Sequence, residues 1–239
     1  MKHQKLLLIL LFIFCFSMAN AQQNISVFYK TAGFKHESIP TGIQALKEIA
    51  ADNGWKVIAT DDAEKFVSEL SNIDAVIFLS TTGDIFTEDQ QEKFTNYIEN
   101  GGNFFGIHAA SDTEYDWPWY GKFIGAYFES HPRTQEATVI VEKPKNHMVA
   151  HLPKRWTRTD EWYNFKNINS NIQVLLTLDE TSYEGGKNGD FHPHAWYQEF
   201  EGGSKMVYTG GGHTKETYAE PLFREHLKRC IQFLLDKRD

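Results

Sequence analysis

The sequence predicts one α/β domain with a mostly parallel sheet and helices on both of its faces. In the first half of the chain, short apolar runs alternate with amphipathic segments at the spacing of βαβ units. A second observation is the stretch 101–108, in which glycines precede a buried strand that stops abruptly at His108. The chain shows no internal repeat and no stretch of linker composition. Residues 22–239 are therefore expected to form a single domain.

Each element of the first half follows from local signals. Pro40 in a first turn and Gly54 past a last turn mark the ends of one helix, and Thr87 is the expected N-cap of another. Continuous apolar runs indicate strands that are buried on both faces. The predicted strands are 25–29, 55–59, 74–79 and 103–108, and the predicted helices are 40–53, 63–70 and 88–100.

The second half of the chain is less regular. Strands are expected at 136–141, 174–178, 195–200 and 205–208, and a C-terminal helix is expected at 222–237. The loops between them are long and rich in His, Trp, Asp and Gly. Because loops of this length in a compact domain are usually functional or ordered by local packing, they are expected to carry site residues.

Residues 1–21 have the pattern of a signal peptide. Lys2 and Lys5 precede an apolar run at 6–16, and Ala19-Asn20-Ala21 supplies a cleavage site. The run is shorter than the roughly 20 apolar residues that a spanning helix needs. The mature chain is therefore expected to begin near Gln22, to be exported to the periplasm or out of the cell, and to have no membrane partner.

Charge and cysteine content exclude several classes of function. The formal net charge is −8 and no cluster of lysine and arginine is present, which argues against a nucleic-acid partner. Beyond the leader only Cys230 remains, so neither an intramolecular disulfide nor a thiol nucleophile is expected. It lies between Leu227 and Ile231 in the last helix and is expected to be a core residue. These features do not distinguish a monomer from a homo-oligomer.

His108 stands where a strand turns sharply into the next segment. Glycine before this position, and Ala109 and Ala110 after it, permit a turn that pushes one side chain above the sheet. Imidazole transfers protons and binds metals, so acid–base or metal chemistry is indicated. Because a side chain above the sheet contributes little packing, replacing His108 with alanine is expected to leave stability nearly unchanged. The alternative interpretation is that His108 only ends a strand.

Other polar residues follow predicted strands in the same way. His36 follows the first strand, Asp112 follows the fourth, and His213 follows the strand at 205–208. Ligands of open parallel sheets bind at the carboxyl ends of the strands. We therefore expect these residues to meet at one edge, where loops of the second half would add Glu161 and His131. For His36 and His213, the alternative that they are ordinary loop histidines without a functional role is equally well supported.

The glycine run 210–212 and the candidate metal ligands are less specific signals of function. The run lacks the Lys-Ser/Thr ending of a phosphate loop, so its glycines are expected to let the backbone approach a ligand while His213 points toward it. A divalent metal held by His131, Glu161 and one histidine of the elbow is a further interpretation. No HExxH or comparable pair is present, so no cofactor is predicted from a motif.

Aromatic residues make up 14% of the chain, and several lie in predicted loops. Trp and Tyr suit the apolar faces of sugar rings, although most buried aromatic side chains are simply core. This composition suits a carbohydrate ligand but does not by itself distinguish a binding site from core. The candidate substrate-binding residues are Trp117, His131, Tyr163, His194 and Trp196.

Six motifs occur in an order that covers nearly all of the mature chain. They are Gly33-Phe34-Lys35-His36, Gly106-Ile107-His108-Ala109, His131-Pro132, Asp160-Glu161-Trp162-Tyr163, Pro193-His194-Ala195-Trp196 and Gly211-Gly212-His213. Together they resemble the ThuA-like (trehalose utilisation) family of the class I glutamine amidotransferase-like superfamily. The resemblance implies a flavodoxin-like fold with a nucleophile elbow. His108 stands where the amidotransferases have cysteine, so glutamine hydrolysis is not expected.

The resemblance also implies a role in disaccharide use through 3-keto-glycoside intermediates. The leading hypothesis is an exported enzyme, a lyase or hydrolase, that acts on a glycoside or 3-keto-sugar. A keto group acidifies the neighbouring C–H, which a neutral histidine removes as a general base. His108 is the first candidate for the base, and His213 or His36 would polarise the keto oxygen. Asp112 or Glu161 would orient an imidazole or hold sugar hydroxyls.

Two other hypotheses stay open at this point. One is a non-catalytic sugar-binding protein that uses the same residues, because a fold does not determine a function. The other is a metal-assisted hydrolase that uses the same histidines. Turnover of a 3-keto-glycoside would distinguish an enzyme from a sugar-binding protein. Metal analysis of the purified protein would test the metal-assisted hydrolase.

Overall fold

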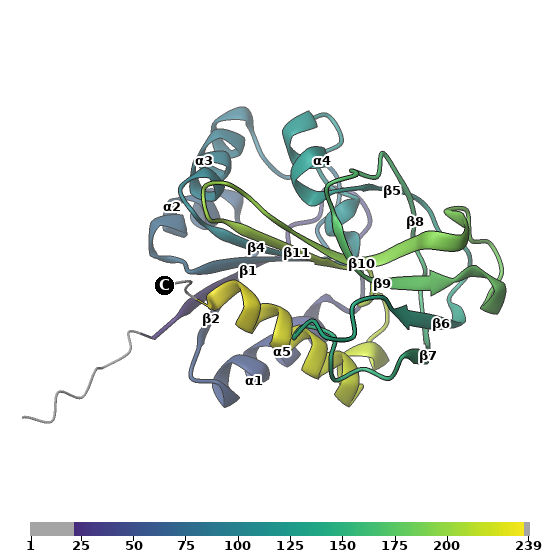
Figure 1. Cartoon of the computed structure of the whole chain (residues 1–239). Helices are drawn as coiled ribbons and strands as arrows, with labels where there is room; N and C mark the ends of the chain where they lie inside the picture. The colour runs from purple at the N-terminus through teal and green to yellow at the C-terminus, as the bar shows by residue number, and fades with distance from the viewer. Residues whose placement is uncertain (1–21, 237–239) are drawn as a thin grey trace, which may run out of the picture.

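The computed structural model of the chain describes residues 22–236. Within this range a nine-stranded sheet has the strand order β2-β1-β3-β4-β11-β10-β9-β6-β7, with helices on either side (Figure 1). The strands from β2 to β11 in this order run parallel. Their bounds are β1 Asn24–Phe28, β2 Lys56–Thr60, β3 Ala75–Leu79, β4 Asn103–Ile107 and β11 Lys205–Thr209.

The second half of the chain extends this sheet with antiparallel strands. β10 pairs with β11, and β9, β6 and β7 follow, each antiparallel to the one before it. Four reversals separate β11 from β7, so the carboxyl end of β7 lies at the same edge as that of β11. A separate antiparallel pair joins β5 to β8. The bounds are β5 Tyr127–Ser130, β6 Gln135–Val141, β7 Arg155–Asp160, β8 Asn164–Lys166, β9 Gln173–Asp179 and β10 His192–Glu199.

The helices cover both faces of the sheet. On one face lie α1 (Ile39–Asp52) and α5 (Pro221–Leu235), and on the other lie α2 (Ala63–Glu69), α3 (Glu88–Glu99) and α4 (Pro118–Ile124) (Figure 1). Each layer has its own apolar cluster. The residues of β3 alternate between the two clusters, because successive side chains of a strand point to opposite faces. The continuous apolar run therefore marks a strand buried on both faces, as predicted.

The predicted α/β fold is confirmed, and in the first half every predicted element is present within one residue of its expected bounds. Thr87 is the N-cap of α3, where its hydroxyl accepts from the backbone N–H of Gln90 in a capping box. The C-terminal helix ends at Leu235, two residues earlier than predicted. Among its described α-helices and strands, the second half holds four that were not predicted: α4, β5, β7 and β8.

Two further predictions concern the ends of the chain. Cys230 is fully buried in the apolar cluster beneath α5, so its expected place in the core is confirmed. Burial raises the pKa of its thiol well above the usual value. The predicted signal peptide at 1–21 lies outside the described residues. No helix within 22–236 has the length and apolar character needed to cross a membrane.

Candidate functional site

Three histidines follow the carboxyl ends of parallel strands at one edge of the sheet. His36 lies in the loop after β1, His108 directly follows β4, and His213 lies in the loop after β11. Because these strands run parallel, their carboxyl ends meet at the same edge. The ring centroids lie 4.8 Å apart for His36 and His108, and each lies 5.3 Å from that of His213. The predicted convergence of the three histidines is confirmed.

His108 occupies the sharp turn that the sequence indicates. Its φ of +52° lies in the left-handed region, which residues other than glycine adopt rarely. The chain then enters a short 3-10 turn, His108–Ser111. A Cβ added at Gly106 would lie 3.1 Å from the Cβ of Ala110, a tight contact that would force a neighbouring group to shift. The absence of a side chain at Gly106 therefore accommodates close packing at the turn.

Glu161 joins the histidines from the carboxyl end of β7. Its Oε2 lies 3.5 Å from His108 Nε2 and 3.2 Å from His213 Nδ1, and these two nitrogens are 3.3 Å apart. One potential ligand atom from each of His36, His108, Glu161 and His213 lies within 4.8 Å of the others. We call these four residues the histidine–glutamate cluster. Their donor atoms are of the kind that binds a divalent metal.

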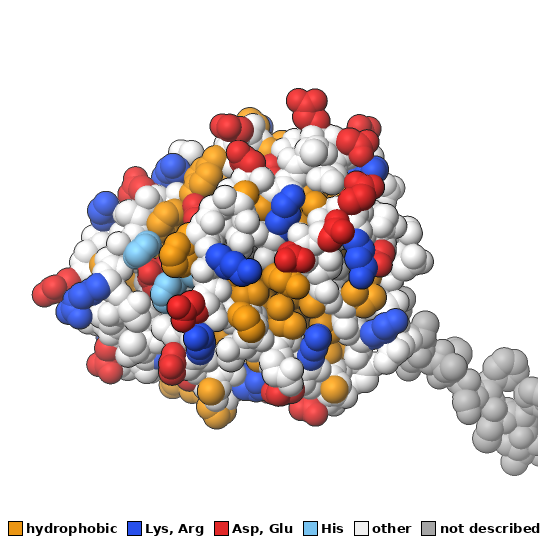
Figure 2. Space-filling view, turned by 180° about the vertical axis from the view of Figure 1, so that it is seen from behind, with side chains coloured by type: hydrophobic (Ala, Val, Ile, Leu, Met, Phe, Trp, Pro, Cys, Tyr) orange, Lys and Arg blue, Asp and Glu red, His pale blue; other side chains and the backbone are white. Residues whose placement is uncertain are grey.

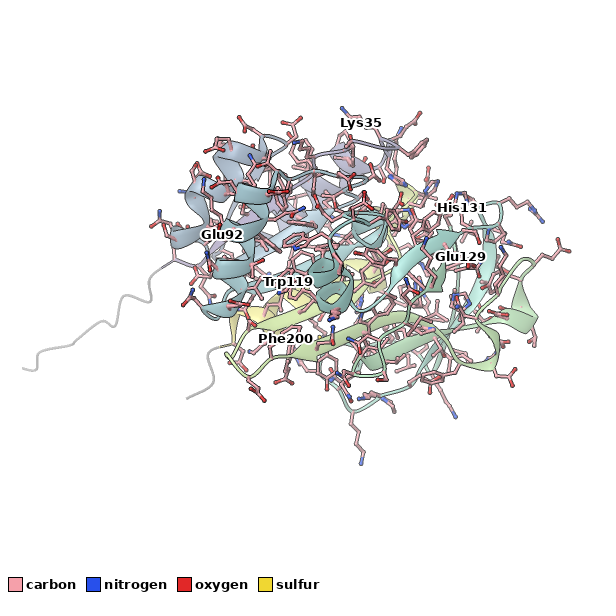
Figure 3. The ribbon with its side chains drawn as sticks, turned by 90° about the horizontal axis from the view of Figure 1, so that it is seen from above. Lys35, Glu92, Trp119, Glu129, His131 and Phe200 are labelled. Atoms are coloured by element: carbon pink, nitrogen blue, oxygen red, sulfur yellow. The ribbon has the colours of Figure 1, made fainter. Side chains whose placement is uncertain are left out.

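His131 adds a fifth polar group from the loop after β5. Its Nδ1 lies 3.0 Å from Glu161 Oε1 and 2.9 Å from the carbonyl oxygen of Pro132. Both neighbours only accept hydrogen bonds, so the neutral ring carries its proton on Nδ1 and a lone pair on Nε2. Figure 3 shows His131 at the same end of the molecule as Lys35, which precedes His36 in the chain.

The electrostatics of the site centre on the Glu161 carboxylate. Burial raises its pKa, but the contacts with His108 and His213 outweigh burial and hold that pKa well below its usual range. The hydrogen bond with Glu161 in turn raises the pKa of His213. Burial and the neighbouring His108 lower the pKa of His36 to about 3, so this ring is neutral at physiological pH. The site therefore holds an ionised carboxylate that faces several imidazoles.

The expectation that His108 stands exposed above the sheet is wrong. Its side chain is 0% exposed, because His36, His213 and Tyr163 pack over it. The Tyr163 ring centroid lies 4.3 Å from that of His108. Solvent reaches the site at His213, whose side chain is 25% exposed, and at His131, at 43%. Figure 2 shows histidine side chains at the surface beside hydrophobic and acidic ones.

Replacing His108 with alanine is therefore expected to destabilise the fold, contrary to the expectation from the sequence. The change removes a fully buried ring whose Nδ1 lies 2.9 Å from the carbonyl oxygen of Gly210. A cavity and a lost buried hydrogen bond together cost roughly 2–4 kcal/mol. Urea unfolding measures this loss. The control His147→Ala removes an exposed ring and should change stability by less than about 0.5 kcal/mol; equal stabilities would contradict the prediction.

Asp160 holds the loop that carries His213, and sequence reasoning did not assign it this role. Its carboxylate is fully buried and accepts from the backbone N–H groups of Gly212, at 2.9 Å, and His213, at 3.1 Å. It also accepts from the Thr217 hydroxyl at 2.9 Å and pairs with the buried Arg158 at 3.2 Å. Asp160 therefore positions His213 without facing the site itself.

The glycines at 210–212 serve packing inside the protein, not the approach of a ligand. A Cβ at Gly210 would lie 2.8 Å from His194 Nδ1, and one at Gly212 would lie 2.7 Å from the Tyr218 hydroxyl. Gly212 also has a φ of +123°, which favours glycine. The expected role of these glycines at a ligand is therefore corrected.

Two of the residues proposed to bind substrate are buried. Tyr163 is the ring that packs on His108, and it also contacts Phe128 at a centroid distance of 4.3 Å. His194 is 2% exposed and packs against Trp162. Burial lowers the pKa of His194 well below its usual value, so the ring is neutral. Neither side chain presents its polar end to solvent.

Three other proposed site residues lie outside the cluster. Asp112 is half-buried and its Oδ1 accepts from the Tyr115 hydroxyl at 2.6 Å. Trp117 stacks on Trp119, which Figure 3 places away from His131. Trp196 is fully buried, and its Nε1 donates to the carbonyl oxygen of Ile124. The two tryptophans pack in the core layer of α3 and α4, because a composition rich in aromatic residues does not separate core from surface.

Solved structures with a similar fold include two ThuA-like proteins. The one from Bacteroides uniformis has a TM-score of 0.76 and 24% identity, over 92% of this chain and 94% of that chain. The one from Parabacteroides merdae has a TM-score of 0.74 and 17% identity, over 90% of each chain. The cytoplasmic protein STM3548 from Salmonella typhimurium is similar at a TM-score of 0.62 and 10% identity, over 88% of this chain and 98% of that chain.

A search of curated proteins finds no match to this chain. The family model described as ThuA, trehalose utilisation, matches residues 24–234. This match includes every strand of the sheet and all members of the histidine–glutamate cluster. The predicted resemblance is thereby confirmed, and the chain belongs to the ThuA (trehalose utilisation) family.

Proposed function

We propose that this chain is an exported enzyme that acts on a 3-keto-glycoside or a related keto-sugar at the histidine–glutamate cluster. The observation that carries the proposal is the convergence of three histidines and Glu161 at the carboxyl edge of the parallel strands, with His131 beside them. Ligands of α/β sheets bind at this edge. The family description, trehalose utilisation, supports a sugar as the substrate class.

The geometry favours a general base other than His108, which the sequence made the first candidate. His108 is fully buried, so it does not reach the C–H of a substrate. His131 is exposed and has a free lone pair on Nε2, with a carboxylate behind its Nδ1. A neutral imidazole held in this way is suited to act as a general base. We therefore assign proton removal to His131 and polarisation of the keto oxygen to the cluster, at the His213 side.

In the proposed reaction His131 takes the proton from the carbon that lies between the keto group and the glycosidic carbon. The electron pair forms a C=C bond as the glycosidic C–O bond breaks, and the departing oxygen takes a proton from solvent and leaves as an alcohol. The negative charge that develops on the keto oxygen is stabilised where positive groups or hydrogen-bond donors are already in place. His213 is the member of the cluster whose side chain is partly exposed, so it is the group placed to donate a hydrogen bond to that oxygen. Water addition to the eliminated sugar would make the overall reaction a hydrolysis.

Purified protein is expected to consume a 3-keto-disaccharide and to leave the unoxidised disaccharide unchanged. Replacing His131 with alanine should lower kcat by about 10²–10⁴-fold, the usual contribution of general base catalysis. The fold should persist, because the side chain is 43% exposed. Chromatography of the products measures both effects.

The matched control is His147→Ala, which removes an exposed histidine whose Nε2 lies 3.2 Å from Gln232 Oε1 on α5. Its turnover should equal that of the unmodified protein. Saturable binding of the keto-sugar without any turnover would contradict an enzyme and favour a sugar-binding protein. Equal activity of the His131→Ala protein would remove His131 from the reaction.

A further inference from the structure

We infer that the histidine–glutamate cluster binds one divalent transition-metal ion, of the zinc class. The inference starts from geometry: one potential ligand atom from each of His36, His108, Glu161 and His213 lies within 4.8 Å of the others. Three of the four residues are buried and the fourth is partly exposed, so the ligands surround a point that is closed on most sides. Metal binding is independent of the proposed reaction, whereas any use of the metal in catalysis rests on the proposed function.

The spacing of the three closest donor atoms matches tetrahedral coordination. His213 Nδ1, His108 Nε2 and Glu161 Oε2 form a triangle with sides of 3.2, 3.3 and 3.5 Å. Zinc lies about 2.0–2.2 Å from nitrogen and oxygen ligands, so neighbouring ligands of a tetrahedron are about 3.3–3.5 Å apart. The three atoms therefore form one face of a tetrahedron around a zinc-sized ion.

The hydrogen-bond pattern around His108 leaves its inner nitrogen without a proton. Its Nδ1 lies 2.9 Å from the carbonyl oxygen of Gly210, which only accepts, so Nδ1 carries the proton of the neutral ring. The lone pair of Nε2 then faces the Glu161 carboxylate, which also only accepts. A cation between the two groups would bind both the lone pair of His108 Nε2 and the Glu161 carboxylate. A backbone carbonyl behind a ligating histidine is the usual support of a metal site.

His36 provides an independent observation. It is 4% exposed, and its Nδ1 is buried without a hydrogen-bond partner among the described residues. Leaving such a group unsatisfied is costly. Its ring stands nearly perpendicular to those of His108 and His213, at 85° and 90°. The three imidazoles therefore meet edge to face and do not stack on one another.

The donor set selects the class of metal. Imidazole nitrogen is a preferred ligand of zinc and of other first-row divalent ions. Calcium and magnesium favour sites built from oxygen alone, which a set of three imidazoles does not offer. His131 stays outside the four, with its Nδ1 3.0 Å from Glu161 Oε1, where it would hold the carboxylate in place.

The test measures metal binding without any sugar. The protein is purified, freed of any histidine tag, stripped with a chelator, and titrated with Zn²⁺ by calorimetry and with Co²⁺ by visible absorption. We expect one equivalent to bind, and the Co²⁺ form to show the intense bands of a tetrahedral site. Bound metal should also raise the Tm in a concentration-dependent way, because it binds only the folded chain.

His213→Ala is the main variant, because its side chain is partly exposed and its loss should leave the fold intact. Its Zn²⁺ affinity should fall by about 100-fold or more. The matched control His147→Ala should bind Zn²⁺ as the unmodified protein does. Equal affinity of these two variants, or no stoichiometric binding by the folded unmodified protein, overturns the metal site. Because no sugar is present, this result is separate from a failure of keto-sugar turnover.

Discussion

Replacing Glu161 with glutamine is expected to abolish most turnover of the keto-sugar while the sheet stays folded. The two oxygens of Glu161 face nitrogens of three histidines: Oε2 faces His108 and His213, and Oε1 faces His131. Glutamine keeps the shape but turns one oxygen into an NH₂ group, which cannot accept, so at least one histidine loses its partner. We expect kcat/KM to fall by about 10²–10³-fold, as for the loss of one electrostatic group in an active site.

The control for this change is Glu129→Gln. Glu129 is exposed on β5, and Figure 3 shows it close to His131, so the substitution removes the same charge from the same end of the molecule. Its turnover should stay near that of the unmodified protein. An equal fall in both variants would mean that general electrostatics, and not the contacts of Glu161, supports activity. Circular dichroism and urea unfolding would show that both proteins are folded.

The position of the three histidines could be predicted because it depends on local signals and one topological rule. The apolar runs that become β1 and β4 are short, continuous and bounded by glycine or polar residues. Once such runs alternate with helices, the strands are parallel and their carboxyl ends meet. The positions of His36 and His108 at this edge can be predicted because each residue follows one of these runs in the sequence. No long-range contact has to be known.

The environment of His108 could not be predicted in the same way. Part of its burial comes from Tyr163, which lies 55 residues further along the chain and reaches it from the loop after β7. β7, the last strand of the sheet, was missed because two of its three buried positions, Arg158 and Asp160, are charged. With Trp156 as the only apolar residue among the three, the segment lacks the apolar–polar alternation that marks a strand. Because β7 was not predicted, the hydrogen-bond partners of Asp160 could not be predicted either.

Replacing Asp160 with asparagine is expected to cause the largest loss of stability among the changes considered. The buried carboxylate accepts from Gly212, His213 and Thr217 and faces the guanidinium of Arg158 at 3.2 Å. Asparagine would point an NH₂ group at donors and leave Arg158 with only the partly exposed Glu220, at 3.1 Å, as a charged partner. Breaking a buried pair in this way costs roughly 3–5 kcal/mol, a large share of the roughly 5–15 kcal/mol that stabilise a domain.

Urea unfolding measures this loss, and hydrogen exchange locates it. The backbone N–H groups of Gly212 and His213 donate to Asp160, so their exchange should accelerate in the variant beyond that of the core strands. The exposed Asp190→Asn is the control and should change stability by less than about 0.5 kcal/mol.

A double variant separates the cause of the loss. Arg158→Met combined with Asp160→Asn removes both charges, and replacing both partners of a buried pair by neutral groups costs less than removing one. The double variant should therefore recover part of the stability that Asp160→Asn loses. It should not recover slow exchange at Gly212 and His213, because their N–H groups still lack the carboxylate. Recovery of both would mean that the charge of Arg158, and not the hydrogen bonds of Asp160, governs the loop that carries His213.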